Sequence, residues 1–334
     1  MHEAGYYTNL SPGLVRCELC PHQCTIAQGE RGVCKVRHMS DNVLYTDAYG
    51  KLSSVALDPV EKKPIYHWHP GSAILSIGSV GCNLECKNCQ NEKISQCIGI
   101  DTASISSYTA EEISLQATKN TPPLLAFTYN EPTVFYEFMA DIAQTAIEKG
   151  VECAMITNGY IMQDPLRKLL PIIEAFNVDL KAFNNDFYKS ITGGSLRPVL
   201  RSLDQIKNSG AHLEISYLII PGLNDDPAEF GRMIEYLRKT FGRSQVLHLT
   251  RYFPKYKLDV QPTPLSTIDL LMGIAQEELD FVYPGNTGNE MDANTYCPVC
   301  GHLLIQRINY HTRILGIRDG SCDRCNEKIY GKFN

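Results

Sequence analysis

The clustering of cysteine is the feature of this sequence that most constrains its fold. The chain contains 13 cysteines, and eleven of them lie in three tight groups, which leaves only Cys97 and Cys153 alone. A chain of 334 residues is too large to need disulfides for its stability, and an odd count argues against a disulfide framework. Grouped cysteines are typical of metal sites in intracellular proteins. We therefore expect three metal sites, and we interpret Cys153, in the apolar run 151–156, as a small core residue.

Composition narrows the class of protein further. Hydrophobic residues make up 43% of the chain, enough for a folded core, and the formal net charge is -6. An acidic balance makes nucleic-acid binding unlikely. No apolar run approaches the ~20 residues that cross a bilayer, and residues 1–10 do not resemble a signal peptide. We expect a cytoplasmic protein without a membrane partner.

Local composition and hydrophobic periodicity divide the chain into three regions. Residues 1–70 are rich in Gly, Pro, Cys and His and show no sustained helical period, and residues 291–334 form a short tail with paired cysteines. Between them, residues 71–290 alternate short apolar runs with helix-period segments, which is typical of βαβ units around a parallel sheet. The strands are expected at Ala73–Ile77, Leu124–Tyr129, Glu152–Thr157, Asn177–Lys181, Leu213–Ile220, Val246–Thr250 and Phe281–Tyr283.

Helix start signals fall in the gaps between these strands. Thr109 and Glu112 form a capping box for a helix that runs to about Lys119, and Pro132 is typical of a first helical turn. Two more helices are expected, one after Asp226 and one over Ser266–Glu278, with a turn-rich stretch at 284–294. The predicted fold class is α/β: a partial (β/α)6-type TIM barrel with a Cys-rich N-terminal extension and a small zinc-ribbon-like C-terminal tail.

The central cysteine group has the spacing C-x3-C-x2-C and comprises Cys82, Cys86 and Cys89, directly after the first expected strand. Three thiolates on one short loop can hold three irons of a 4Fe–4S cluster and leave the fourth iron without a protein ligand. An open coordination position is where a small molecule can bind and react. The alternative is a structural site that borrows a distant Cys or His.

Several further motifs follow in a fixed order along the chain. They are Phe127-Thr128-Tyr129-Asn130-Glu131-Pro132-Thr133, Thr157-Asn158-Gly159-Tyr160, the segments 177–183 and 218–226, and the cysteine patterns at 17–24 and 297–301. With the central loop, they resemble the radical S-adenosylmethionine (SAM) superfamily. Within it, the chain is similar to the radical SAM member of the AmmeMemoRadiSam system, a family related to pyruvate formate-lyase activating enzymes. The resemblance covers nearly the whole chain.

This resemblance implies which residues contact SAM. The expected cofactor-binding residues lie at the ends of four strands: Tyr129, Asn130, Glu131, Thr157, Asn158, Gly159, Asp179, Lys181, Pro221 and Gly222. Asp179 and Lys181 are two residues apart, so on a strand they share a face and suit the amine and carboxylate of SAM. The alternative interpretation gives these residues structural roles only: Asp179 and Lys181 would form an ordinary salt bridge in the barrel, and Glu131 would mark the start of a helix.

The sequence departs from the superfamily pattern at three places. Tyr129 and Asn130 stand where two glycines allow close backbone approach to SAM. Asn88 replaces the aromatic residue that usually precedes the third cluster cysteine, so adenine would need another apolar contact, from Leu84 or Tyr129. Ile156 occupies a position where some activating enzymes carry an Asp that helps to hold a monovalent cation.

The two other cysteine groups each contain four thiols. Cys297, Cys300, Cys322 and Cys325 resemble a zinc ribbon with a closed shell, and a rubredoxin-like iron is the alternative. Cys17, Cys20, Cys24 and Cys34 lie within 18 residues, and their spacing is compatible with zinc or with an auxiliary 4Fe–4S cluster.

The resemblance implies an oxidoreductase or activase that cleaves SAM reductively at the 4Fe–4S cluster. The 5'-deoxyadenosyl radical would abstract hydrogen from a protein, peptide or small molecule handled with Memo-like and AMMECR-like partners. An electron donor such as ferredoxin or flavodoxin is also implied. One alternative is a glycyl-radical enzyme activase, and another is a non-catalytic metal-binding or nucleic-acid-binding module.

Overall fold

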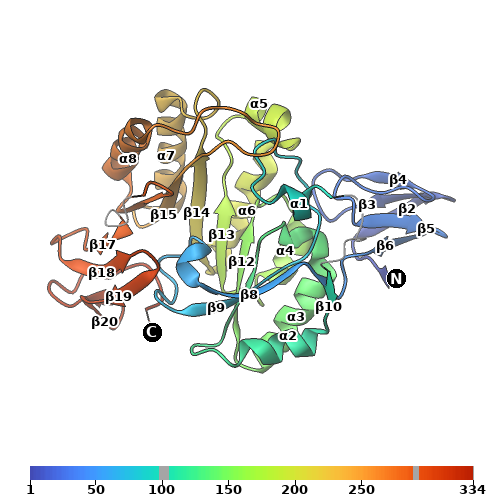
Figure 1. Ribbon diagram of the computed structural model, residues 1–334, viewed down its shortest axis with the longest axis horizontal. Helices are drawn as coiled ribbons and strands as arrows, with labels where there is room; N and C mark the ends of the chain where they lie inside the picture. Colours follow the sequence, from blue (N-terminus) through green and yellow to red (C-terminus); the bar gives the residue numbers. More distant parts are fainter. Residues whose placement is uncertain (98–104, 289–292, 334) are drawn as a thin grey trace.

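An eight-stranded sheet forms the centre of the molecule (Figure 1). The computed structural model describes residues 1–97, 105–288 and 293–333. The strand order is β16-β15-β14-β13-β12-β11-β9-β8, and all neighbours are parallel except β8 and β9. The strands are β8 (Ser54–Pro59), β9 (Ala73–Gly78), β11 (Leu124–Phe127), β12 (Glu152–Thr157), β13 (Ala175–Asp179), β14 (His212–Ile219), β15 (Val246–Arg251) and β16 (Phe281–Gly285). The sheet curves but ends at β8 and β16, which confirms the predicted partial barrel.

The longer helices cover the outer face of this sheet: α2 (Ala110–Ala117), α3 (Tyr136–Glu148), α4 (Gln163–Leu169), α6 (Leu196–Ser209), α7 (Pro227–Phe241) and α8 (Leu265–Glu278). Short helical segments lie in the connections that follow the strands: α1 (Glu92–Ser95), η2 (Pro132–Phe135), α5 (Asn185–Phe187) and η3 (Tyr188–Thr192). The predicted capping box is present, because Glu112 N–H donates to Thr109 Oγ1 at 3.2 Å and Thr109 N–H donates to Glu112 Oε2 at 2.8 Å. The parallel strands are buried on both faces, as β11 shows with four buried residues.

Two strands end earlier than the sequence predicted. β11 stops at Phe127 because Tyr129 adopts a left-handed backbone conformation with φ of 70°. β13 stops at Asp179, so the prediction that places Lys181 on the strand is wrong. The physical reason is a hydrogen bond: Lys181 N–H donates to the hydroxyl of Tyr188 at 3.1 Å instead of to the neighbouring strand.

The N-terminal extension contains short strands rather than irregular chain. Two three-stranded antiparallel sheets have the orders β1-β6-β5 and β2-β3-β4, and β7 pairs with β10. The strands are β1 (His2–Glu3), β2 (Tyr7–Ser11), β3 (Leu14–Cys17), β4 (Thr25–Ala27), β5 (Arg37–Ser40), β6 (Val43–Thr46), β7 (Lys51–Leu52) and β10 (Ser106–Ser107). β8 follows β7 in the chain and belongs to the barrel sheet, so residues 54–70 pack with the barrel.

The segment 60–69, which we call the plug, fills the inside of the barrel. It begins with the 3-10 turn η1 (Val60–Lys62), and its apolar side chains pack on inward-facing residues of four strands. These plug residues are Val60, Ile65 and Trp68, and their strand partners are Ile74, Leu124, Ala126, Ala154 and Ala175. A parallel barrel needs such filling because its interior is a packed core.

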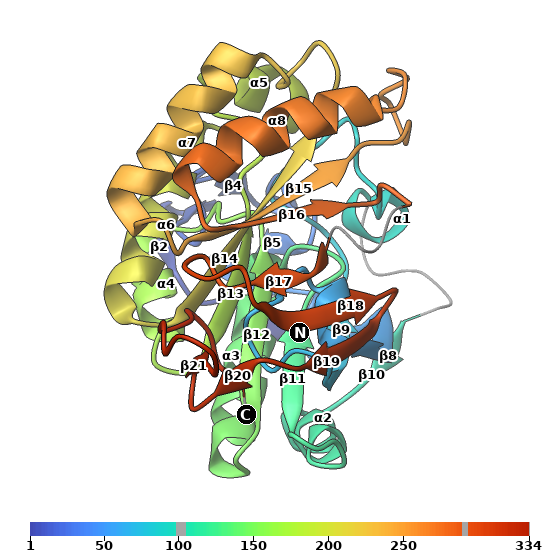
Figure 2. The same cartoon turned by 90° about the vertical axis from the view of Figure 1, so that its left-hand side faces the viewer.

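The C-terminal tail lies against the open side of the barrel (Figure 2). Its strands are β17 (Thr295–Tyr296), β18 (Leu303–Ile308), β19 (His311–Ile314), β20 (Ile317–Arg318) and β21 (Ser321–Cys322). The turn-rich stretch predicted at 284–294 falls partly outside the described residues. The predicted domain boundary between 290 and 291 falls wholly outside them. Within the described ranges, no helix is both long and apolar enough to cross a membrane.

Candidate active site

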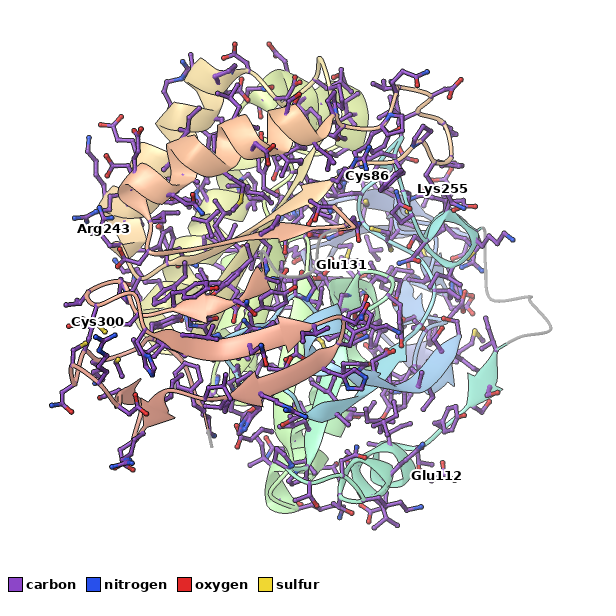
Figure 3. The ribbon with its side chains drawn as sticks, turned by 60° about the vertical axis from the view of Figure 1, so that its left-hand side comes forward. Cys86, Glu112, Glu131, Arg243, Lys255 and Cys300 are labelled. Atoms are coloured by element: carbon purple, nitrogen blue, oxygen red, sulfur yellow. The ribbon has the colours of Figure 1, made fainter. Side chains whose placement is uncertain are left out.

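The central cysteine loop lies just beyond the C-terminal end of β9, on the side of the barrel where Figure 3 shows Cys86 and Glu131. Backbone bonds attach the loop to η3, since Glu85 N–H donates to Thr192 O and Lys87 N–H donates to Ile191 O. Burial raises the pKa of Cys82 well above its usual value and that of Cys86 to about 11. A bound metal would favour the thiolate form of these side chains, which metal ligation requires.

Three buried asparagines hold the loop in place. Asn130 accepts from Ser79 N–H at 2.9 Å and donates to Gly81 O at 3.0 Å. Asn158 Nδ2 donates to Asn83 Oδ1 at 2.9 Å and lies 3.8 Å from the Cys82 sulfur. Each amide joins chain segments that are far apart in sequence, so the loop has a fixed position at the barrel mouth. Asn130 and Asn158, which the resemblance assigned to SAM, thus contact the cysteine loop.

Tyr129 occupies the position of a family glycine and keeps a glycine-like backbone. Its φ of 70° lies in the left-handed region, which is strained for a residue with a side chain. Its hydroxyl donates to Asp58 Oδ2 at 2.6 Å, and the Lys63 ammonium lies 4.5 Å from the centre of its ring. Lys63 in turn binds Asp58 at 2.7 Å. These contacts hold the strained residue, and they turn its ring toward β8 and the plug.

The carboxylate of Glu131 is fully used by protein donors. Oε1 accepts from Thr133 N–H, Thr133 Oγ1 and Thr157 Oγ1, and Oε2 accepts from Asn158 N–H at 2.8 Å. Burial raises the pKa of Glu131, against the lowering effect of these bonds. Glu131 therefore joins the end of β12 to the start of η2. Gly159 follows in this turn with φ of 67°, where a Cβ would lie 3.0 Å from Val178.

Asp179 and Lys181 form an ion pair beside the cysteine loop. Lys181 Nζ lies 2.7 Å from Asp179 Oδ2, and both side chains are half-buried. Burial lowers the pKa of Lys181, but Asp179 and the sulfur of Cys86 outweigh this effect and raise it above its usual value. The pair thus presents both charges at the mouth of the barrel, although only Asp179 is on a strand.

Pro221 and Gly222 lie on the loop after β14. Gly222 is exposed, has φ of 72°, and donates its N–H to Asp225 Oδ1. The loop is fixed by Asn224, whose Nδ2 donates to Lys181 O and Leu218 O at 2.8 Å each. Asn224 therefore ties the loop to the residue that carries the site's positive charge.

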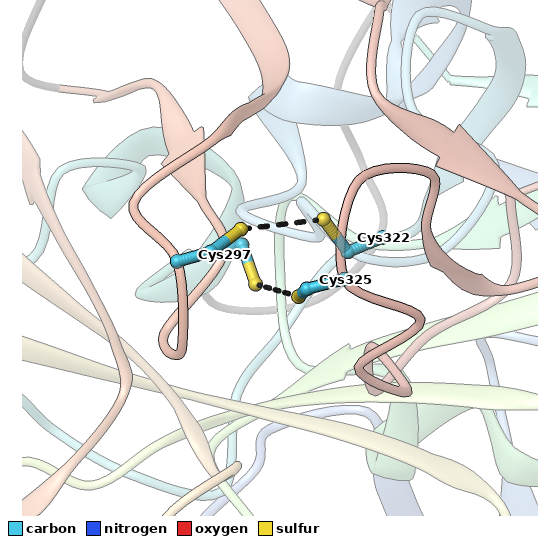
Figure 4. A group of neighbouring side chains, drawn as sticks. Cys297, Cys322 and Cys325 are labelled. Atoms are coloured by element: carbon cyan, nitrogen blue, oxygen red, sulfur yellow. Dashed lines mark hydrogen bonds between the residues drawn. The ribbon is translucent and has the colours of Figure 1, made fainter.

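The tail cysteines make a compact set of four sulfurs (Figure 4). Cys297 Sγ lies 3.5 Å from Cys325 Sγ, and Cys300 Sγ lies 3.7 Å from Cys322 Sγ. A tetrahedral ion with bonds of ~2.3 Å places its sulfurs ~3.8 Å apart. Within the described ranges, this is the one group of three or more candidate ligands whose atoms all lie within 4.8 Å of one another. The tail therefore fits one four-coordinate ion, as a zinc ribbon requires.

The central and N-terminal cysteines do not form such a compact set of candidate ligands among the described residues. The expectation that Cys82, Cys86 and Cys89 hold a 4Fe–4S cluster with one open iron stays a prediction. The four N-terminal cysteines line one small cavity beside Asn83.

A larger polar cavity of about 390 Å³ lies between the barrel, the plug and the tail. Its walls include Glu61 and Tyr66 from the plug, His248 and Thr250 from β15, and Tyr310 from the tail. Glu61 is 5% exposed; its Oε1 accepts from Gly71 N–H, and its buried Oε2 has no partner among the described residues.

Sequence reasoning missed the residues that support the site. Asp58, Lys63, Asn83 and Asn224 all contact distant segments, and none belongs to a pattern that indicates such contacts. Within the segment 61–64, Lys63 binds Asp58 and Glu61 accepts from Gly71 N–H.

Comparison with known proteins gives consistent results. The model of the family "Radical SAM superfamily" matches residues 76–235. The uncharacterized protein MJ0808 of Methanocaldococcus jannaschii is 43% identical over 333 residues, which cover 98% of this chain and 99% of that protein. The pyruvate formate-lyase 1-activating enzyme of Escherichia coli K12 is 23% identical over 212 residues, covering 59% of this chain and 86% of the enzyme. A radical SAM methyltransferase structure from Sphaerobacter thermophilus has the same fold, at 15% identity and a TM-score of 0.50, covering 65% of this chain and 67% of that chain.

Proposed function

The chain belongs to the radical SAM superfamily, and from this premise we propose that Cys82, Cys86 and Cys89 hold its catalytic 4Fe–4S cluster. The superfamily implies an enzyme that binds SAM and a 4Fe–4S cluster. When bound, the reduced cluster supplies one electron that cleaves SAM to methionine and a 5'-deoxyadenosyl radical. The protein's contribution is to position the cofactor and to exclude competing reactions.

The residues around the loop divide into two roles in this proposal. Asp179 and Lys181 bind the amine and the carboxylate of SAM, because a paired anion and cation match a zwitterion. Asn130, Asn158 and Glu131 position the cysteine loop and the β12 turn through their hydrogen bonds. Tyr129, Thr157, Gly159, Pro221 and Gly222 border the same mouth at the strand ends.

The observation that carries this proposal is the half-buried three-cysteine loop beside the charged pair at the C-terminal strand ends. Cys86→Ala removes one of three required thiolates. The anaerobic, reduced variant should lose the EPR signal that changes shape with SAM and should form no 5'-deoxyadenosine. Cys97→Ala, outside all three groups, is the matched control and should keep both. A Cys86→Ala protein that still cleaves SAM would refute the assignment.

For the substrate, we propose a protein, peptide or small molecule that donates a hydrogen atom inside the cavity beside Glu61. The cavity is lined by polar side chains, among them Glu61, Tyr66 and His248, which suits a substrate with hydrogen-bonding groups. The resemblance of the sequence motifs to the AmmeMemoRadiSam family is the ground for proposing Memo-like and AMMECR-like partners. A ferredoxin or flavodoxin is the proposed electron donor. Co-migration of this protein with separately purified Memo-like and AMMECR-like proteins in size-exclusion chromatography tests whether they bind it.

A glycyl-radical enzyme activase is the second candidate. It is favoured by the similarity to the Escherichia coli activating enzyme and to the benzylsuccinate synthase activating enzyme of Thauera aromatica, which is 30% identical over 110 residues. The test is formation of a glycyl-radical EPR signal in a candidate target enzyme. A glycyl-radical signal in the target enzyme would favour the activase function over the modification of a protein, peptide or small molecule.

We also propose that the four tail cysteines bind a structural zinc ion. Their sulfur spacing supports a single tetrahedral ion. Metal analysis of the purified protein should find one tightly held zinc per chain, with rubredoxin-like iron as the alternative outcome. The N-terminal cysteines bind metal as well, as zinc or as a second iron–sulfur cluster.

A further inference from the structure

A loop rich in lysine and aromatic residues rests on the cysteine loop of the active site. We call residues 251–257, at the end of β15, the lysine loop; three of its seven residues are Lys or Arg, and three are Phe or Tyr. Lys257 N–H donates to Lys87 O at 2.9 Å, and Lys87 directly follows Cys86 in the chain. Figure 3 shows Lys255 on the same side of the molecule as Cys86. The lysine loop therefore lies next to the residues that would hold the catalytic cluster.

The charge at this place is positive, although the whole chain has a formal net charge of -6. The cations are three exposed lysines and one arginine, which we call the lysine patch: Lys87, Lys255, Lys257 and Arg251. Three acidic residues are near them in the sequence: Glu85, Glu92 and Asp259. Glu92 is 3.9 Å from Lys255, and the side chain of Glu85 lies against Gly193. The patch thus keeps an excess of positive charge, which attracts a partner with an acidic surface.

Two exposed aromatic rings stand beside these charges. Phe253 is 43% exposed, and the guanidinium of Arg251 lies 4.8 Å from the centre of its ring. Tyr256 is 41% exposed, and Lys257 Nζ lies 4.9 Å from the centre of its ring. Aromatic and Arg side chains are enriched where proteins contact one another. The lysine loop therefore has the apolar as well as the charged groups of a docking surface.

The lysine loop is held in place by its own hydrogen bonds. The buried Tyr252 donates its hydroxyl to Leu258 O at 2.7 Å and its N–H to Thr263 Oγ1 at 3.1 Å. Lys255 and Leu258 exchange two backbone hydrogen bonds of 3.3 Å each. A surface that is already ordered loses little conformational entropy when a partner binds.

We propose that the lysine patch is the docking surface for the protein that supplies the electron, and that this donor contacts the patch with an acidic face. The proposal rests on the proposed function, because an electron is required only if the central cysteines hold the catalytic cluster. In each encounter the donor loses one electron and the cluster gains it, and no covalent bond forms or breaks at the patch.

The position of the patch favours an electron donor over other acidic partners. Lys87 lies between Cys86 and Cys89, so a protein that touches Lys87 approaches the cluster through the cysteine loop. Such a donor need not enter the barrel, where SAM and the substrate are proposed to bind. Lysines beside exposed aromatic rings also suit single-stranded RNA, so the test includes RNA as the competing occupant.

The test compares protein donors with a chemical one. Lys255→Glu/Lys257→Glu reverses two exposed charges of the patch. With a reduced acidic flavodoxin or ferredoxin at low salt, this variant should form 5'-deoxyadenosine about tenfold more slowly than the unmodified protein, because docking loses its charge complementarity. Added salt should slow the unmodified protein in the same assay. With dithionite, which needs no docking surface, the two proteins should have equal rates.

Lys119→Glu/Lys239→Glu is the matched control, since it makes the same change of charge at exposed sites after α2 and on α7. It should keep the rate with both kinds of donor. Binding of the oxidised flavodoxin and ferredoxin, measured by surface plasmon resonance, gives a readout that does not depend on SAM cleavage. Both should bind the unmodified protein and the control more tightly than the patch variant.

The outcomes separate the docking surface from the proposed function. If the patch variant binds and uses both protein donors as the unmodified protein does, the docking proposal is refuted while SAM cleavage stands. If the unmodified protein binds a donor through the patch but forms no 5'-deoxyadenosine even with dithionite, only the proposed function fails. If neither donor binds, and a single-stranded oligouridylate binds the unmodified protein but not the patch variant, the patch is an RNA site and the docking proposal is wrong.

Discussion

The amide of Asn130 joins two backbone groups of the segment that leads into the cysteine loop. Asn130→Ala would leave Ser79 N–H and Gly81 O without this partner, at a cost of about 1–3 kcal/mol. The loss should appear as lower iron retention at the central site, because the loop is then held less firmly. Iron analysis and the SAM-responsive EPR signal measure it. Asn208→Ala, on the exposed face of α6, is the control.

Lys181 makes a different contribution, so its removal should have a different signature. Lys181→Ala removes the cation of the charged pair and should weaken SAM binding at least tenfold, because the SAM carboxylate loses its partner. Iron and sulfide content should stay unchanged. Isothermal titration with SAM measures the affinity.

Lys239→Ala is the matched control for Lys181→Ala, since Lys239 belongs to an exposed pair with Glu235. If Lys181→Ala binds SAM normally but melts at a lower temperature, the pair only stabilises the barrel. Normal affinity would therefore return Asp179 and Lys181 to a structural role.

For single residues, the sequence identified candidate metal and SAM ligands better than it identified the residues that hold them in place by hydrogen bonds. Cysteine spacing fixes the metal candidates because ligands on one loop are close in sequence, and the pair at 179 and 181 is also local. The bond from Tyr129 to Asp58 spans 71 residues, and the one from Asn158 to Asn83 spans 75. No local pattern indicates such contacts. The glycine-like backbone of Tyr129 was likewise visible only in the structure.

Among the elements, the plug connects the barrel to the tail through a buried polar network. Glu214, on β14, accepts from the N–H groups of Tyr66 and His67 and from the rings of His212 and His248. Burial tends to raise the pKa of Glu214, but the two histidines hold it well below its usual value. His67 also contacts Tyr330 O and the Tyr283 hydroxyl at 2.6 Å each. The plug, a strand and the tail thus share one set of hydrogen bonds.

This network predicts acid sensitivity through His67. Burial lowers the pKa of His67 to about 3, while the unfolded chain protonates it near 6.5. The unfolded state therefore binds more protons below pH ~6.5, so stability is full above that pH and falls toward pH ~3. From pH 7.5 to 5.5 this single group should cost on the order of 1 kcal/mol. Anaerobic urea unfolding, followed by the fluorescence of the buried Trp68, measures it.

His67→Gln should flatten this pH dependence relative to the unmodified protein, because glutamine does not titrate. His311→Gln, at an exposed site on β19, should leave it unchanged. An equal slope for His67→Gln and the unmodified protein would show that His67 titrates normally in the folded state.

Local periodicity and helix caps were enough to predict the strands and helices of the barrel. The errors in these predictions concern where the elements end. Pairing partners decide where a strand stops, as the Tyr188 hydroxyl does for Lys181. The short N-terminal strands were missed because segments of two to five residues carry too little periodicity. The packing of the plug inside the barrel depends on contacts that no segment encodes alone.

On the scale of the whole molecule, Arg307 joins the zinc-ribbon-like tail to the barrel. Its side chain is 1% exposed; Nη2 donates to Tyr66 O at 2.7 Å, and Nη1 donates to Ala293 O and Thr295 Oγ1. The guanidinium also lies 4.4 Å from the centre of the Tyr66 ring. Because Tyr66 is bound to Glu214 inside the barrel, we expect the tail and the barrel to unfold together.

Arg307→Met tests this coupling, because it keeps the length of the side chain and removes its donors. Three acceptors lose their partner, so the free energy of unfolding should fall by about 2–4 kcal/mol. Zinc release, followed with a chromogenic chelator, and barrel unfolding, followed by circular dichroism, should shift to lower urea concentration by the same amount. Arg318→Met, exposed on β20, should shift neither. If zinc release alone moved while the barrel transition stayed in place, the tail would be an independent unit, and the cavity beside Glu61 would have a movable wall.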